Sequence, residues 1–202
     1  GLRTSKLSYH PVALLEKYGF EDICISMKSS SVPTTMRAYQ LMAQKYDFPL
    51  HLGVTEAGTA DIGSIKSAAG IGGLLGLGIG DTFRVTLTAD PVEEIVLAKK
   101  ILKAVGLRKD GPELISCPTC GRTQIDLIPM AHKVEELLKG VDKPITVAVM
   151  GCVVNGPGEA RHADVGIAGG KGEGVLFLHG EIVDKVPEDQ LIPRLMALID
   201  TL

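Results

Sequence analysis

Three cysteines are the residues of this chain whose types and spacing best suit shared chemistry. Cys117 and Cys120 enclose a C-x-x-C turn, Cys117-Pro118-Thr119-Cys120, and Cys152 follows further along the chain. Two thiols separated by two residues can point into one volume and hold a single metal centre. Shared metal binding explains the three thiols better than separate buried positions do, because Cys152 also precedes a glycine- and proline-rich loop. The sequence therefore predicts a metal centre held by Cys117, Cys120 and Cys152.

The type of the fourth ligand distinguishes a structural zinc site from an iron–sulfur cluster. A structural zinc site closes its tetrahedron with Cys or His. An iron–sulfur cluster held by three thiolates leaves one iron for a weaker ligand or a substrate, which suits catalysis. Glu159 is the carboxylate best placed by sequence for that position, and Asn155 is expected to orient its loop. His132 and His162 are ligands in principle, although single histidines at such places are usually solvated.

The amino-acid composition excludes several classes of protein. The 202 residues are 45% hydrophobic and carry a formal net charge of −3, which gives no global attraction to nucleic acid or to an anionic membrane. Aromatic residues make up 4% of the chain, too few for a base-stacking surface. Glycine and charge interrupt the apolar runs, so we expect no spanning helix and no signal peptide. Four cysteines are too few for a disulfide scaffold, and a cytoplasmic α/β protein without membrane or nucleic-acid partners is expected.

The first half alternates between strand and helix patterns. Helices are predicted over 11–18, 34–46, 62–77 and 91–105, and strands over 23–27, 49–54 and 81–87. This alternation is typical of parallel βαβ units. Three such units are too few to close a barrel of eight, so either the sheet is open or the chain is the back part of a longer protein.

Polar residues recur where these strands end: Lys28, His51, Thr55, Glu56, Arg84 and Thr86. The carboxyl ends of barrel strands carry catalytic residues. A single polar residue there is more often an ordinary surface group, but three successive strands favour a site. Cys24, between two isoleucines, is expected to be a small buried side chain. The glycine-rich run 70–78 matches no nucleotide-binding motif and predicts close helix packing.

The second half predicts an α+β unit. The polar turn at 109–112 marks the boundary, so we expect a barrel-like unit over 1–110 and a second unit over 111–202. We predict helices over 126–138 and 187–202, a strand over 145–150, a hairpin of 163–168 with 174–178, and a further strand at 180–183. The glycine-rich turn 169–174 is expected to be a hairpin tip rather than a phosphate cradle.

Several of these motifs together resemble one known family. They are Ser116–Arg122, Gly151–Ala160, Ile25–Ser30, Leu50–Gly58 and Gly78–Val85. They resemble the 4-hydroxy-3-methylbut-2-enyl diphosphate synthases, iron–sulfur enzymes of the non-mevalonate isoprenoid pathway. The resemblance runs from about residue 19 to the end. It implies a TIM-like barrel followed by a domain similar to sulfite and nitrite reductases. This chain would begin near the fifth or sixth barrel strand, and residues 1–9 match weakly.

The resemblance also implies an activity and a set of residues. The family opens 2-C-methyl-D-erythritol 2,4-cyclodiphosphate reductively, as a homodimer, with electrons from flavodoxin or ferredoxin. A 4Fe–4S cluster would be held by Cys117, Cys120, Cys152 and Glu159. Lys28 and Arg84 match positions that face the diphosphate. The positions that match the same pocket or its catalytic groups are His51, Thr55, Glu56, Thr86, Asn155 and Glu159, with Glu56 a proton donor or orienting group.

Two other functions remain open. A zinc-ribbon-like module would use the three cysteines with His162 or Glu159 and would have no redox role. A ferredoxin-like electron carrier would favour four cysteine ligands and no substrate pocket, so Lys28, His51 and Arg84 argue against it. Visible absorption distinguishes the zinc module from the iron–sulfur enzyme, because zinc thiolates are colourless and the cluster is brown.

Overall fold

The computed structural model describes residues 11–154, 158 and 160–202. The chain divides into two compact units between Arg108 and Lys109, called here unit 1 and unit 2. Each unit mixes helices with strands and has a hydrophobic core of its own. In the part of the chain that is described, we find no helix both long and apolar enough to cross a membrane.

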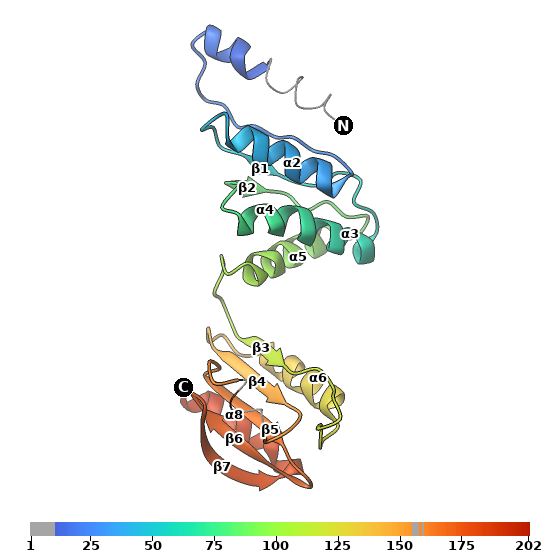
Figure 1. The fold of residues 1–202 in the computed structure, drawn as a ribbon, viewed down its shortest axis with the longest axis vertical. Helices are drawn as coiled ribbons and strands as arrows, with labels where there is room; N and C mark the ends of the chain where they lie inside the picture. The colour runs from blue at the N-terminus through green and yellow to red at the C-terminus, as the bar shows by residue number, and fades with distance from the viewer. Residues whose placement is uncertain (1–10, 155–157, 159) are drawn as a thin grey trace. The chain divides into compact units, whose positions relative to one another are not determined.

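Unit 1 repeats strand and helix along the chain (Figure 1). Residues 11–17 are helical and a further strand-like segment follows at 23–29. The remaining elements are α2 (Val32–Ala43), β1 (His51–Leu52), α3 (Ala60–Ser67), the π-helix η1 (Ala68–Gly72), α4 (Gly73–Gly76), β2 (Thr82–Phe83) and α5 (Pro91–Ala104). β1 and β2 pair in parallel, and isolated parallel bridges join Ile25 to Leu50 and Thr59 to Thr88. The parallel strand–helix repeat is confirmed, although both strands are shorter than predicted.

Local signals explain where two of these helices begin. The Ser31 hydroxyl accepts a hydrogen bond from the Thr34 amide at the start of α2, and the Asp90 carboxylate accepts one from the Val92 amide at the start of α5. Each cap satisfies a backbone donor that has no partner within the helix. A proline in the first turn of each helix adds a backbone angle already suited to it.

The glycine-rich run packs closely, as predicted. A methyl group added at Gly70 would lie 2.8 Å from Val54 Cγ2, and one added at Gly73 would lie 2.9 Å from Met36 Cε. Since real Cβ atoms hardly ever approach so closely, these positions accept only glycine without a local shift. The run therefore lets the helices approach their neighbours closely.

The strand segments of unit 1 have two distinct faces, because successive side chains of a strand alternate. One face is buried in the core with the helices: Ile25, Met27, Leu50, Leu52 and Val85. The other, called here the polar face, holds Cys24, Ser26, Lys28, His51, Gly53, Thr55, Thr82, Arg84 and Thr86. Cys24 is exposed, so the prediction that it is buried was wrong. The isoleucines on either side of it turn toward the core, and the alternation places its thiol on the opposite face.

Unit 2 is built on a five-stranded mixed sheet of order β3-β4-β5-β6-β7. The strands are β3 (Glu113–Ser116), β4 (Thr146–Met150), β5 (Val165–Gly169), β6 (Glu173–Leu178) and β7 (Glu181–Pro187). The pairs β3–β4 and β4–β5 are parallel, whereas β5–β6 and β6–β7 are antiparallel. The hairpin prediction is confirmed, and the glycine-rich turn is its tip, where the Gly170 amide donates to the Glu173 carbonyl over 2.7 Å.

Both faces of this sheet are covered. α6 (Leu127–Leu138) and α8 (Leu191–Thr201) pack on one face, where Val147, Val149 and Ile167 are fully buried. On the other face, Phe177 is fully buried beside Ala160 and Ala163, which follow the third cysteine in the chain. α8 begins four residues later than predicted, because residues 188–190 form a 3-10 turn, η2.

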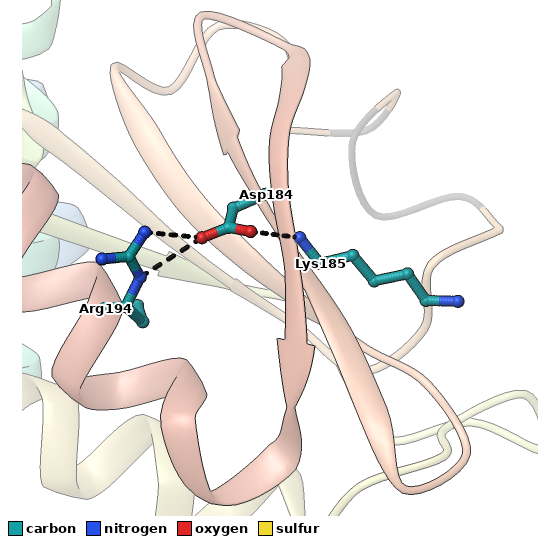
Figure 2. A network of polar contacts seen from close by, with 3 residues as sticks. All are labelled: Asp184, Lys185 and Arg194. Atoms are coloured by element: carbon teal, nitrogen blue, oxygen red, sulfur yellow. Dashed lines mark hydrogen bonds and ion pairs between the residues drawn. The ribbon is translucent and has the colours of Figure 1, made fainter.

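A polar contact ties the edge strand to the last helix. Arg194 of α8 donates to Asp184 Oδ2 of β7 from Nη2 over 2.7 Å and from Nε over 3.2 Å (Figure 2). The Lys185 amide donates to the other carboxylate oxygen over 2.8 Å. The pKa of Asp184 is lowered, first by the Arg194 hydrogen bond and then by the Lys185 amide. The folded state therefore favours the ionised carboxylate, and this preference is lost as the pH falls through the lowered pKa.

Candidate functional site

Two adjacent strands of unit 2 deliver the cysteines to one edge of the sheet. Cys117 directly follows the end of β3, and Cys152 lies two residues beyond the end of β4. The two strands are parallel and Ser116 pairs with Val149, so both ends lie at the same edge. The edge of the sheet where β3 and β4 end, with Cys117 and Cys152 just beyond them, is called here the thiol edge.

Gly151 is the point at which the two cysteine loops touch. Its amide donates to Cys117 Sγ over 3.2 Å, and its carbonyl accepts from the Gln124 amide over 2.9 Å. A methyl group added at Gly151 would lie 3.0 Å from Thr123 Cγ2 and 3.1 Å from Thr123 Oγ1. The loop of Cys152 is therefore seated on the turn that follows the C-x-x-C pair, where a methyl group at Gly151 would force Thr123 to shift by a few tenths of an ångström.

The turn that follows the C-x-x-C pair runs from Cys120 to Thr123 and is closed by Thr123. The Cys120 amide donates to Thr123 Oγ1 over 3.1 Å, and the Thr123 amide donates to the Cys120 carbonyl over 3.0 Å. The pKa of the Cys120 thiol is lowered, chiefly by a hydrogen bond from the Arg122 backbone. Cys120 is exposed, Cys117 is half-buried and Cys152 is buried. The turn thus favours a thiolate at the exposed position, and thiolates are the form that binds metals.

The thiols of Cys117, Cys120 and Cys152 are suitable metal ligands by their chemistry, and they come from the same edge of the sheet. However, over residues 11–154, 158 and 160–202, no three His, Cys, Asp or Glu side chains converge closely enough to hold a metal ion. Asn155 and Glu159, both predicted site residues, lie outside the described residues. His132 Nδ1 lies 3.7 Å from a carboxylate oxygen of Glu135, with both side chains exposed, and the exposed His162 accepts a hydrogen bond from Arg161 Nε over 3.2 Å. Both histidines are solvated, as predicted.

A groove of about 500 Å³ runs beside Cys117, between the thiol edge and α6. Apolar side chains line much of it, and its polar groups include Ser116, Thr119, His132 and Glu135. Cys117 is therefore one of the residues that solvent in the groove contacts.

The second group of predicted residues gathers on the polar face of unit 1. Lys28 lies across the neighbouring strand, because a methyl group added at Gly53 would lie 3.0 Å from Lys28 Cε and 3.3 Å from Lys28 Nζ. The same methyl would lie 3.1 Å from the Arg84 carbonyl oxygen. His51 Nδ1 is 2.8 Å from Thr82 Oγ1, its partner in the parallel ladder. Three strands thus bring Lys28, His51 and Arg84 to one place.

Burial and the charges on these side chains lower the pKa values of Lys28 and His51. The pKa of Lys28 is lowered by burial and then by the positive charge of Arg84. The pKa of His51 is lowered by burial and then by Lys28 and Arg84. An anion that binds beside these cations offsets the repulsion between them and therefore stabilises their charged forms. The arrangement can therefore hold a phosphate-like group on the polar face.

The other predicted residues of unit 1 divide into two groups. Thr55 and Thr86 are half-buried on the polar face, and the Thr55 amide donates to the Ser29 carbonyl over 3.3 Å. Glu56 is exposed and has a positive φ of 52°, an uncommon conformation for a residue other than glycine. It lies beyond the end of β1, and alternation along the strand does not place it on the polar face.

Sequence reasoning missed several residues that shape these sites: Tyr39, Gly53, Thr82, Thr123 and Gly151. A glycine inside a strand pattern indicates a close approach, and this signal could have found Gly53. Gly151 lies just beyond the predicted strand 145–150, so this signal does not cover it. Tyr39 gave none, because a tyrosine on an amphipathic helix is ordinarily a core residue.

The fold and the two sites define a two-unit α/β protein with a cationic face on a parallel strand–helix layer and a thiol edge on a mixed sheet. Two family models match this chain: the GcpE TIM-barrel domain over residues 4–99 and the GcpE protein C-terminal domain over residues 113–201. The chain belongs to the GcpE family. The barrel-domain match begins at residue 4, earlier than the start near residue 19 that the resemblance predicted.

Curated relatives show the same similarity. One from Clostridium perfringens is 62% identical over 191 residues, which are 95% of this chain and 55% of the relative. One from Geobacter sulfurreducens is 60% identical over 94% of this chain and 54% of the relative. One from Anoxybacillus flavithermus is 54% identical over 96% of this chain and 53% of the relative. All three are named 4-hydroxy-3-methylbut-2-en-1-yl diphosphate synthase (flavodoxin), and this chain spans about half of their length. The predicted family is confirmed.

Proposed function

We propose that this chain supplies the cluster unit and part of the barrel unit of a 4-hydroxy-3-methylbut-2-enyl diphosphate synthase. The reaction would be the reductive opening of 2-C-methyl-D-erythritol 2,4-cyclodiphosphate, with two electrons and loss of water. The observation that carries the proposal is the pairing of sites within one chain. A cationic face suited to a diphosphate is encoded with a thiol edge suited to a redox cluster, and relatives of that name align over both.

Cys117, Cys120, Cys152 and Glu159 would hold a 4Fe–4S cluster. When bound, such a cluster supplies electrons and a Lewis acid at the carbon–oxygen bond that is broken. The Gly151 amide already donates to Cys117 Sγ, and an amide hydrogen bond of this kind stabilises negative charge on sulfur. Glu159 offers a hard carboxylate, which matches soft thiolate-bound iron poorly and can give way to a substrate oxygen.

The polar face of unit 1 would bind the substrate. Lys28 and Arg84 would offset the charge of the diphosphate, and Thr55, Thr86 and Asn155 would donate hydrogen bonds to it. The lowered pKa of His51 keeps its imidazole neutral near pH 7, so it can donate or accept a proton there. Glu56 would act as a proton donor or would orient the substrate.

The remaining features of the proposal come from the resemblance. The electron donor would be flavodoxin or ferredoxin, and the flavodoxin named for the relatives supports the first. We further propose a homodimer located in the cytoplasm, with no nucleic-acid or membrane partner. The second unit would have the fold of the sulfite and nitrite reductases, in keeping with its mixed sheet covered by α6 and α8.

The decisive measurement is iron and labile sulfide content after anaerobic reconstitution, with an EPR spectrum, for the wild-type chain and Glu159→Ala. Close to four irons per chain in both, with an altered spectrum in the variant, would support three cysteine ligands and an iron held by Glu159. Stoichiometric zinc without labile sulfide would overturn the proposal in favour of a structural module.

The substrate site needs its own measurement. Binding of inorganic diphosphate to the wild-type chain is expected to weaken by about tenfold or more in Lys28→Ala, because a charged hydrogen bond contributes about 1.5–3 kcal/mol. Lys66→Ala, which removes a lysine from α3, is the matched control. Equal affinity in all three proteins would exclude the polar face as the diphosphate site.

A further inference from the structure

The backbone ladder between segment 23–29 and the next strand is interrupted around Met27. The Ile25 amide donates to the Pro49 carbonyl and the His51 amide donates to the Ile25 carbonyl, both over 2.8 Å. Further on, the Thr55 amide donates to the Ser29 carbonyl over 3.3 Å. These three bonds share one register, so the two strands remain aligned on both sides of the interruption.

In a regular parallel ladder, the bond after the one from His51 to Ile25 would join the Met27 amide to the His51 carbonyl. Instead, the Met27 amide donates to Tyr39 Oη over 2.9 Å, and the Tyr39 hydroxyl donates to the His51 carbonyl. The hydroxyl is thus inserted into the ladder, and it satisfies both the backbone donor and the backbone acceptor.

Tyr39 is suited to hold this position. Its side chain comes from α2 and is fully buried in the core of unit 1. Burial raises the pKa of the Tyr39 phenol, so the hydroxyl keeps the proton that it donates. A buried backbone group without a hydrogen-bond partner costs free energy, so the Met27 amide and the His51 carbonyl both stay within hydrogen-bond distance of the hydroxyl. The hydroxyl therefore holds the two strands at one spacing.

The interruption coincides with the polar face. Lys28 follows Met27 directly, and His51 carries the carbonyl that the hydroxyl binds. Opposite the interruption, Lys28 lies over Gly53, where no side chain competes for the space. Tyr39 thus binds the carbonyl of His51 itself and the amide of the residue next to Lys28.

We propose that Tyr39 is a positioning residue, whose hydroxyl spaces the two strands so that Lys28 and His51 converge on the polar face. The proposal rests on the proposed function only in that the converging cations serve a diphosphate. Tyr39 acts through the two strands and does not touch the ligand.

The test is Tyr39→Phe, with Tyr18→Phe as the matched control because Tyr18 is exposed and lies outside both sites. Three quantities are measured: hydrogen exchange of the Met27 amide, the pKa of His51 by NMR, and the affinity for inorganic diphosphate. We expect Tyr39→Phe to speed the exchange, to move the pKa of His51 toward its ordinary value, and to weaken diphosphate binding by about tenfold. Tyr18→Phe should match the wild type in all three.

Gly53→Ala provides a second variant, because its methyl displaces Lys28 without changing the tyrosine. It should weaken diphosphate binding while the Met27 amide exchanges as slowly as in the wild type. If Tyr39→Phe leaves both the pKa of His51 and diphosphate affinity unchanged, the positioning role is overturned. If no protein binds diphosphate but the pKa of His51 moves in Tyr39→Phe, the positioning role stands and the proposed substrate site fails.

Discussion

At the scale of single residues, His51 joins charge, burial and hydrogen bonding in one side chain. It pairs with Thr82 through Nδ1, and burial, Lys28 and Arg84 lower its pKa. Because the folded state binds fewer protons than the unfolded state, the stability contribution of His51 is present above its ordinary pKa and is lost as the pH falls below it. Anion binding changes in the opposite direction, since an anion favours the protonated ring.

Because a bound anion favours the protonated ring of His51, anion binding should depend on pH. Sulfate keeps its charge over the range in which histidine titrates, so it isolates the protein's contribution. As the pH falls below about 6.5, sulfate affinity of the wild type should rise by roughly fivefold, as expected for one charge a few ångströms away in water. His51→Gln should remove most of this rise, as measured by titration calorimetry at several pH values. An identical rise in both proteins would exclude His51 as its source.

Gly151 predicts how the thiol edge responds to one methyl group. Gly151→Ala would crowd Thr123, with contacts of 3.0 Å and 3.1 Å, and should reduce the iron retained after reconstitution. Gly121→Ala is the matched control from the same region, because its methyl would meet no heavy atom within 4 Å. Iron content per chain is the measurement. Equal iron in both variants would show that the contact at Gly151 does not align the two cysteine loops.

At the scale of elements, the sheet of unit 2 depends on a glycine facing an aromatic ring. Gly166 of β5 pairs with Phe177 of β6, and a methyl group there would lie 2.3 Å from Phe177 Cζ and 2.8 Å from Ala148 Cβ. The missing side chain therefore makes room for the ring in the core on that face.

This packing predicts a specific cost. Gly166→Ala should destabilise unit 2 by about 1–3 kcal/mol, the usual range for overpacking a core. Gly140→Ala should change stability by no more than about 0.5 kcal/mol, because its methyl would only touch the Leu137 carbonyl oxygen at 3.7 Å. Denaturant midpoints followed by circular dichroism provide the comparison. Equal midpoints for the two variants would mean that the ring moves aside freely.

α5 carries an apolar stripe on its exposed side. Val92, Ile95 and Val96 are 68%, 59% and 48% exposed, and their spacing places them on one side of the helix. An apolar patch of this kind favours association. The stripe therefore predicts that the chain self-associates at high concentration.

Sedimentation velocity tests this prediction. Ile95→Lys should lower the associated fraction, because it places a charge in the middle of the stripe. Glu93→Lys changes the charge of the same helix next to the stripe and should have a smaller effect. A chain that sediments as a monomer at all concentrations would contradict the prediction.

At the scale of the whole molecule, each unit has a core made from its own residues. The core between the unit 2 sheet and its helices begins at Leu114, and the core of unit 1 ends at Ile101. The division after Arg108 lies between them. Independent cores usually allow independent folding.

We therefore expect residues 109–202 to fold when expressed alone. The fragment should unfold cooperatively, at the midpoint that this unit shows within the whole chain, with slow hydrogen exchange in β4, β5 and β6. Far-ultraviolet circular dichroism with denaturant is the measurement. Loss of cooperativity in the fragment would show that unit 2 depends on the preceding residues.

Local patterns in the sequence were enough to predict the order of strands and helices, the β5–β6 hairpin, the close packing of the glycine-rich run, and the gathering of Lys28, His51 and Arg84 at strand ends. These features follow from alternation, capping and turn residues, which act over a few positions. The family could also be recognised from its motifs, because they are long strings of residues. The roles of these residues, and of Asn155 and Glu159, remain predictions.

Only the tertiary structure decided how closely the predicted residues approach one another. The exposure of Cys24 and the hydrogen bond from the Gly151 amide, in the Cys152 loop, to Cys117 Sγ depend on contacts between distant segments. The insertion of Tyr39 is the clearest case, because its hydroxyl comes from a helix and replaces a bond between two strands. No local pattern encodes such a contact, since it forms only when α2 is packed on the strands.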